Sequence, residues 1–109
     1  MNFVSKLEYG ERNLLNEVDV TILMPIFNHN KYLLESIESA LRQTTRIKFA
    51  VLIVDNDAAN EYNNLDIVKS TGSNRIVYFK NSVNIGAVGN WNQCLNLARS
   101  KYVLFLHDD

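Results

Sequence analysis

The chain of 109 residues has little of several features that would narrow its class. It has one cysteine, Cys94, which excludes an internal disulfide, and the Cys/His spacing of a zinc site is absent. The net charge is −1, so there is no electrostatic reason to expect nucleic acid as a partner. No apolar run approaches the ~20 residues of a membrane span. Charges interrupt residues 1–17, unlike a signal peptide. We expect a cytoplasmic protein. Peripheral association with the inner face of the membrane is compatible with this expectation.

Glycine is also scarce where common nucleotide-binding motifs need it. Residues 25–30, after the first apolar run, contain no glycine, which excludes the Gly-x-Gly-x-x-Gly turn of dinucleotide-binding domains. The Gly-Lys-Ser/Thr of a P-loop is absent as well. Any bound phosphate must therefore be held in another way.

What the sequence does contain is a regular alternation of strand and helix patterns. Continuously apolar runs, typical of strands buried on both faces, occupy residues 20–24, 49–54, 76–79 and 102–106. Helical patterns lie between them: Leu33, Ile37 and Leu41 with Asn30 as N-cap; Tyr62, Leu65 and Val68 between an Asp57 cap and a Gly72 stop; and Val88, Trp91, Leu95 and Ala98. The order β-α-β-α-β-α-β predicts an α/β fold with an open, mainly parallel sheet covered on both faces. We expect residues 1–18 to form an arm with a short helix near 13–16, and residues 19–109 to form the domain.

Polar residues follow each predicted strand. They lie in residues 25–30, 55–57, 81–86 and 107–109. Ligands of open α/β sheets bind beyond the carboxyl ends of the strands, so this edge is the predicted site.

The acidic pair that follows the fourth run, Asp108 and Asp109, suits a divalent cation. Carboxylates are hard oxygen ligands for Mg²⁺ or Mn²⁺, which often bind through one or two carboxylates and substrate phosphates. The alternative is a pair of surface acids with no ligand. Two further alternatives stay open: Asp55 could accept a hydrogen bond from a nucleobase or cap the next helix, and Phe27 could lie against a base or close the core.

Four segments together resemble glycosyltransferase family 2, the GT-A group that uses nucleotide-sugar donors. The resemblance covers residues 19–109 and its pieces occur in the family's order. They are Val20-Thr21-Ile22-Leu23-Met24-Pro25-Ile26-Phe27-Asn28, Ile53-Val54-Asp55-Asn56, Asn84-Ile85-Gly86 with Trp91-Asn92, and Tyr102-Val103-Leu104-Phe105-Leu106-His107-Asp108-Asp109. The last of these is similar to the strand that delivers the family's DXD motif. The implied fold is the Rossmann-like, nucleotide-binding half of GT-A.

The resemblance implies a role for each matching residue. Pro25, Phe27, Asn28, Asp55, Asn56, Gly86, Trp91 and Asp108 would line the nucleotide site, with Asp55 on the base and Gly86 allowing close backbone approach. Asp109 would ligate Mg²⁺ or Mn²⁺, with Asp108 and His107 as further candidate ligands. The chain departs from the family pattern in four places. Asn56-Asp57-Ala58 replaces Asp-Gly-Ser, Trp91 replaces an arginine, Cys94 stands where glycine is common, and His107 stands at the first acidic position of the motif.

The implied function is transfer of a sugar from a UDP- or dTDP-sugar to a saccharide or lipid-linked acceptor, such as a growing surface polysaccharide. The family's catalytic base lies after its DXD motif, so we expect it beyond Asp109 and expect the 109 residues alone to be inactive. The alternatives are a non-catalytic nucleotide-binding or assembly module from a truncated glycosyltransferase, and a Rossmann-like domain without a ligand. A sheet that ends with residues 102–106 would expose an edge, which predicts a homodimer.

Overall fold

The computed structural model describes residues 4–27, 32–42, 46–59 and 63–106. Within them, strands and helices alternate along the chain. They are β1 (Ser5–Tyr9), α1 (Leu14–Glu17), β2 (Val20–Ile26), α2 (Leu33–Leu41), β3 (Phe49–Asp55), α3 (Asn64–Ser70), β4 (Ile76–Asn81), α4 (Gly86–Leu97) and β5 (Tyr102–Phe105). The strand order is β1-β4-β3-β2-β5, and all neighbouring pairs except β1 with β4 are parallel. The prediction of an open, mainly parallel α/β sheet is confirmed.

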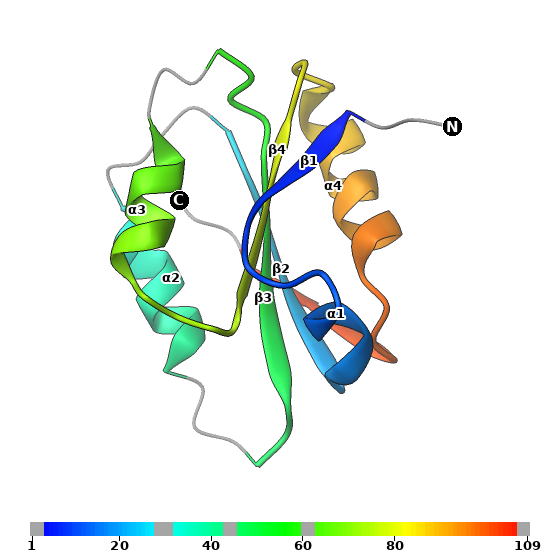
Figure 1. Cartoon of the computed structure of the whole chain (residues 1–109). Helices are drawn as coiled ribbons and strands as arrows, with labels where there is room; N and C mark the ends of the chain where they lie inside the picture. Colours follow the sequence, from blue (N-terminus) through cyan, green and yellow to red (C-terminus); the bar gives the residue numbers. More distant parts are fainter. Residues whose placement is uncertain (1–3, 28–31, 43–45, 60–62, 107–109) are drawn as a thin grey trace.

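The N-terminal arm differs from the prediction in one respect. The short helix is present as α1. The arm also contains β1, which lies beside β4 and pairs with it in antiparallel orientation (Figure 1). The arm therefore adds a fifth strand to the four that the sequence predicted. Ser5 pairs with Asn81, the last residue of β4, so the arm reaches the carboxyl edge of the sheet.

Two layers of helices cover the sheet, with α2 and α3 on one face and α1 and α4 on the other (Figure 1). β3 lies at the centre of the sheet and each of its seven residues is buried. Its side chains alternate between two apolar clusters, one beneath α2 and α3 and one beneath α1 and α4. This double burial explains why the strand sequence is continuously apolar rather than alternating.

The first two predicted helices form, and the structure tests the predicted N-cap of only one of them. α2 buries Leu33 and Ile37 as expected and begins after Tyr32, while the predicted cap Asn30 lies outside the described residues. α3 begins at Asn64, so Asp57 does not cap it, and that prediction is wrong. α3 ends at Ser70, two residues before the predicted stop at Gly72. The φ of Gly72 is +61°, a backbone conformation that favours glycine.

The fourth helix forms where the apolar periodicity predicted it, but it packs through different residues. Val88, Trp91 and Leu95 are exposed by 75%, 39% and 46%, whereas Asn90 and Cys94 are buried against the sheet. The Cys94 thiol is free, and burial raises its pKa to about 12. Apolar spacing therefore located the helix correctly but identified the wrong face, because a buried asparagine took part in the packing.

Candidate functional site

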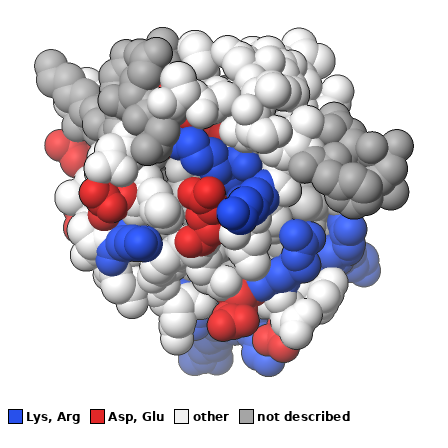
Figure 2. Space-filling model, turned by 45° about the horizontal axis from the view of Figure 1, so that its top comes forward, with Lys and Arg blue, Asp and Glu red and all other residues white. Residues whose placement is uncertain are grey.

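The carboxyl ends of the parallel strands meet at one edge of the sheet, as the sequence predicted. Ile26 ends β2 and pairs with Asp55 at the end of β3. The next residue, Asn56, donates its backbone N–H to the Ile26 carbonyl at 2.8 Å. β5 runs parallel to β2, so its carboxyl end points to the same edge. In Figure 2 this end of the molecule is turned forward, and on the described part of that face basic and acidic side chains lie next to one another.

Asp55 has an exposed fraction of 0%, the lowest among the predicted site residues that the structure describes. Its Oδ1 accepts the backbone N–H of Asp57 at 2.8 Å. Its Oδ2 accepts hydrogen bonds from Tyr78 (2.5 Å) and Asn64 (3.1 Å) and lies 3.7 Å from Lys80 Nζ. Burial raises the pKa of Tyr78, and the charge and hydrogen bond of Asp55 raise it further.

These contacts change what can be expected of Asp55. Both carboxylate oxygens already have partners inside the protein, so a nucleobase would meet Asp55 only if one of those partners gave way. Among the described residues, the Oδ1 of Asn64 is the one buried side-chain nitrogen or oxygen atom without a hydrogen bond. The contact between Asp55 and a base stays a prediction.

The side chain of Asn56 joins two segments that the sequence placed at this edge, residues 55–57 and residues 81–86. Its Oδ1 accepts the backbone N–H of Ile85 at 3.0 Å. Its Nδ2 donates to Asn84 Oδ1 at 2.8 Å and to the Gly86 carbonyl at 3.3 Å. The side chain is 2% exposed, while Asn84 and Gly86 are exposed. A buried amide therefore holds an exposed turn at the amino end of α4.

Two residues behind this turn were not among the predicted site residues: Asn81, which the sequence placed at this edge without a role, and Asn90, which it did not single out. Both are buried and bound to each other, with Asn81 Nδ2 donating to Asn90 Oδ1 at 3.0 Å. Asn90 Nδ2 donates in turn to the carbonyl of Val54 at 2.9 Å. A possible signal was the position of Asn81 at the end of an apolar strand and of Asn90 within a helix, because buried amides need partners.

The remaining predicted residues lie around this edge but do not form one cluster. Pro25 is half-buried within β2, and Phe27, just after β2, is 45% exposed, so the ring does not close the core. Gly86 has a φ of +79°, which favours glycine there, and open space lies where a side chain would begin. Trp91 stacks on Phe105 of β5, with ring centroids 4.5 Å apart. Trp91 also lines an open hollow of about 370 Å³ on α4, together with Ala87, Val88 and Asn92.

The predicted metal ligands Asp108 and Asp109, with His107, lie outside the described residues, as does Asn28. Within residues 4–27, 32–42, 46–59 and 63–106, no group of three His, Cys, Asp or Glu side chains could hold a metal ion. The donor set of the pair, two adjacent carboxylates, fits Mg²⁺ or Mn²⁺ by its chemistry. Metal binding therefore stays a prediction.

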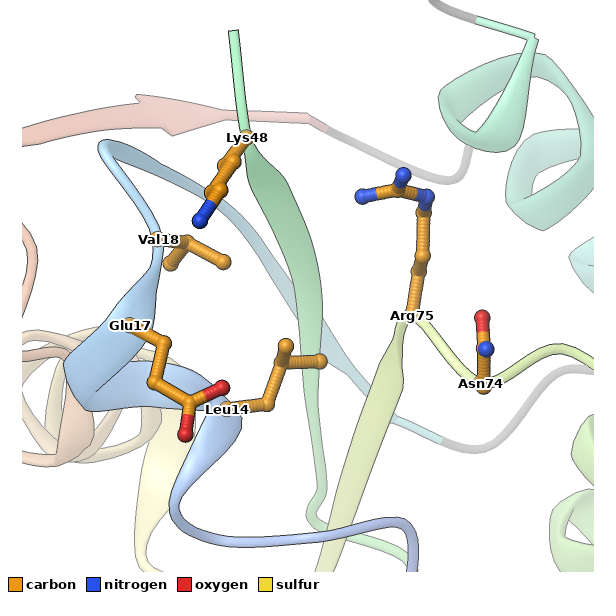
Figure 3. A pocket seen from close by; sticks show the side chains of 6 residues that line it. All are labelled: Leu14, Glu17, Val18, Lys48, Asn74 and Arg75. Atoms are coloured by element: carbon orange, nitrogen blue, oxygen red, sulfur yellow. The ribbon is translucent and has the colours of Figure 1, made fainter.

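A second hollow, of about 280 Å³, lies at the opposite edge of the sheet (Figure 3). Its lining residues belong to or follow α1, or directly precede β3 and β4. They are Leu14, Glu17, Val18, Lys48, Asn74 and Arg75. The amino ends of the strands meet here, away from the segments that follow each strand, so this hollow is distinct from the predicted site.

Comparison with known proteins supports the resemblance seen in the sequence. Residues 21–109 match the model of the family described as "Glycosyl transferase family 2". Among the described residues, no helix is long and apolar enough to cross a membrane.

Several curated relatives carry glycosyltransferase names. An uncharacterized glycosyltransferase of Methanocaldococcus jannaschii is 33% identical over 102 residues, which cover 88% of this chain and 34% of that protein. The Escherichia coli UDP-Glc:alpha-D-GlcNAc-diphosphoundecaprenol beta-1,3-glucosyltransferase WfaP is 30% identical over 83% of this chain and 35% of its own length. The putative colanic acid biosynthesis glycosyl transferase WcaA of E. coli K12 is 32% identical over 83% of this chain and 32% of its own. The chain thus spans about a third of the length of these three relatives. Because the family model matches residues 21–109, which is most of the chain, this protein belongs to glycosyltransferase family 2.

Proposed function

We propose that this chain binds the nucleotide-sugar donor of a glycosyltransferase at the carboxyl edge of its sheet. The observation that carries the proposal is the convergence of the carboxyl ends of β2 and β3 with the turn after β4. Asn56, directly after β3, bonds to Ile26 at the end of β2 through its backbone N–H and to the 84–86 turn through its side-chain amide. Nucleotide ligands of open α/β sheets bind beyond this edge. A UDP- or dTDP-sugar is the proposed donor, and the name of the relative WfaP, which specifies UDP-Glc, favours UDP.

The proposed acceptor is a saccharide or a lipid-linked saccharide used in surface polysaccharide synthesis. Two relatives support this class, since one is named for an acceptor on diphosphoundecaprenol and another for colanic acid biosynthesis. The acceptor and the catalytic base would be bound or supplied by parts of the enzyme beyond these 109 residues. A cytoplasmic location at the inner face of the membrane would suit such an acceptor.

A divalent cation is part of the proposal. When bound, Mg²⁺ or Mn²⁺ would neutralise the diphosphate as the sugar leaves it. Asp109 would be the principal ligand, with Asp108 facing the ribose or diphosphate and His107 nearby in sequence. β5 carries the chain toward the proposed donor edge, because its backbone ladder with β2 continues through the bond from the Leu106 N–H to the Leu23 carbonyl at 2.9 Å.

Thermal unfolding with added nucleotide tests both parts of the proposal. A ligand that binds only the folded state, present at 100 times its Kd, stabilises that state by about 2.7 kcal/mol. UDP or dTDP with Mn²⁺ should therefore raise the Tm of the chain by roughly 10 °C.

The matched variants are Asp109→Ala and Asp19→Ala, the latter an exposed aspartate directly before β2 at the opposite edge. The Mn²⁺-dependent part of the Tm increase should disappear only in Asp109→Ala. An Asp109→Ala protein that responds like the parent would exclude Asp109 as a metal ligand. If neither UDP nor dTDP raises the Tm of the unsubstituted protein, the proposed donor binding is wrong and the chain is a Rossmann-like domain without this ligand.

An assembly role is the second candidate, and the exposure of β5 favours it. β5 lies at the edge of the sheet that the described residues form, and Tyr102, Val103 and Leu104 are exposed by 59%, 41% and 56%. An unpaired apolar edge is a template for pairing with another strand. A homodimer through β5 should appear in sedimentation equilibrium and should dissociate in Leu104→Lys. Monomers at every concentration would refute the homodimer.

A further inference from the structure

The N-terminal strand contacts the proposed donor site, although residues 1–20 precede the segment that matches the family. Ser5 of β1 pairs with Asn81 at the end of β4. The Ser5 hydroxyl donates to Asn81 Oδ1 at 2.5 Å and accepts a hydrogen bond from Gln93 Nε2 of α4 at 3.0 Å. The arm is therefore connected to the polar interior of the domain by a side chain as well as by the strand ladder.

A chain of side-chain amides runs from Ser5 to the exposed turn at residues 84–86. Asn81 Nδ2 donates to Asn56 Oδ1 at 2.9 Å. Asn56 Nδ2 donates to Asn84 Oδ1 at 2.8 Å. Asn81 and Asn56 are 1% and 2% exposed, whereas Asn84 is exposed. We call Ser5, Asn81, Asn56 and Asn84 the amide relay, because each donates to the next.

Backbone groups determine the orientation of the amides along the relay, directly for Asn56 and Asn84 and through Asn90 for Asn81. The N–H of Ile85 donates to Asn56 Oδ1, and the N–H of Gly86 donates to Asn84 Oδ1. Turning either amide over would place a donor against a donor. Asn90 Nδ2 donates to the Val54 carbonyl, so Asn90 Oδ1 faces the amide nitrogen of Asn81. Asn81 Oδ1 therefore has to face Ser5.

The hydroxyl of Ser5 is thus the donor that Asn81 needs. A buried acceptor that loses its partner is costly, and Asn81 is too enclosed for bulk water to replace a missing donor. Without the hydroxyl, the Asn81 amide would turn or shift toward another donor. Either movement would weaken its bond to Asn56, which holds the 84–86 turn.

We propose that Ser5 is a positioning residue for the donor site, acting through the amide relay on the turn at residues 84–86. The proposal rests on the proposed function in one respect, since it takes this turn to contact the nucleotide. The positioning of the turn itself is a property of the free protein, so it can be measured without any ligand.

The chain supplies a matched pair of variants on the same strand. Ser5→Ala and Tyr9→Phe each remove one hydroxyl from β1, but Tyr9 donates to the Ser73 carbonyl at 2.6 Å, away from the relay. Ser5→Thr keeps the hydroxyl and suits a strand, so it should restore the behaviour of the parent. Hydrogen exchange of the Ile85 and Gly86 amides, followed by NMR, reports on the turn, and Leu52 in the buried β3 reports on global opening.

In Ser5→Ala, exchange at Ile85 and Gly86 should accelerate by about fivefold more than exchange at Leu52, the effect of one hydrogen bond. In Tyr9→Phe and Ser5→Thr, the two turn amides should not accelerate relative to Leu52. Equal acceleration at all three amides in Ser5→Ala, or the same pattern in Tyr9→Phe, would overturn the relay.

Titration with UDP and Mn²⁺, monitored by calorimetry, tests the connection to the donor site. The Kd should rise by about fivefold in Ser5→Ala and remain unchanged in Tyr9→Phe. If the parent does not bind UDP, the proposed function fails while the exchange data still decide whether the relay exists. If the parent, Ser5→Ala and Tyr9→Phe bind UDP equally well, Ser5 does not position the donor site.

Discussion

Replacing Tyr78 with phenylalanine measures how much one buried hydrogen bond to Asp55 contributes to stability. Tyr78 and Asp55 are both 0% exposed, and the Tyr78 hydroxyl donates to Asp55 Oδ2 at 2.5 Å. The substitution removes only this hydroxyl and leaves the ring in the core. After it, Asp55 Oδ2 retains Asn64 at 3.1 Å and Lys80 at 3.7 Å.

The expected loss follows from the charge of the acceptor and its burial. A hydrogen bond to a charged group contributes about 1.5–3 kcal/mol, so Tyr78→Phe should lower the free energy of unfolding by about 2 kcal/mol. With an m-value of about 2 kcal/mol per M of urea, the midpoint of unfolding should fall by about 1 M. The m-value should not change, because the native fold is preserved.

Urea unfolding followed by circular dichroism measures this loss, and Tyr9→Phe is the control. Tyr9 donates to a neutral backbone carbonyl and is partly exposed, so its replacement should lower the free energy of unfolding by about 1 kcal/mol. A loss in Tyr78→Phe no greater than that in Tyr9→Phe would refute the argument that the Asp55 contacts are charge-assisted.

The same variant predicts a change in pH dependence. The pKa of Tyr78 is raised above its usual value of 10.0 in the folded protein. Below pH 10 both the folded and the unfolded states keep the phenolic proton, so Tyr78 contributes no pH dependence. Above pH 10 the unfolded state loses that proton first, and the free energy of unfolding should fall with rising pH. This decline should be smaller in Tyr78→Phe, and an identical decline in parent and variant would contradict the assignment.

Two further predictions concern the core and the arm. Burial raises the pKa of Cys94 from 9.0 to about 12, so the thiol should not react with iodoacetamide at pH 8 in the folded protein. It should react after unfolding in urea. Rapid reaction under native conditions would contradict this prediction. Gly10→Ala should destabilise the protein by more than about 2 kcal/mol, because φ is +91° and the new Cβ would lie 2.1 Å from the Ile76 carbonyl oxygen. Gly72→Ala, with φ of +61° and open space around it, should cost only about 1 kcal/mol, so equal losses by thermal unfolding would exclude the steric contact.

The central sheet could be predicted from the chain because its strands are buried on both faces. A continuous apolar run such as residues 49–54 is typical of a strand with helices packed on both faces of its sheet. Their regular spacing, with helices between them, requires parallel connections. The edge that carries the site follows from the same topology, since the segments after parallel strands must emerge on the same side.

The partners within that edge could not be predicted in the same way. Asp55 was expected to serve a base or cap a helix, yet it binds Tyr78 and Asn64, which lie 23 and 9 residues away in the chain. The face of α4 was misjudged for a related reason, since Asn90 is buried among partners supplied by β3 and β4. The spacing of apolar residues assigns polar side chains to the exposed face of a helix. It cannot show that a polar side chain will form hydrogen bonds in the interior.

The sequence by itself therefore determined the family, the parallel order of the sheet and the edge where Asp55, Asn56 and Gly86 gather, because these depend on local pattern and topology. Only the tertiary structure decided that β1 joins the sheet, that Asp55 is enclosed, and that Ser5 is bonded through Asn81 to the proposed donor site. The physical reason is the same in each case. A strand needs a partner edge and a buried polar group needs a hydrogen bond, and in this protein both partners lie far away along the chain.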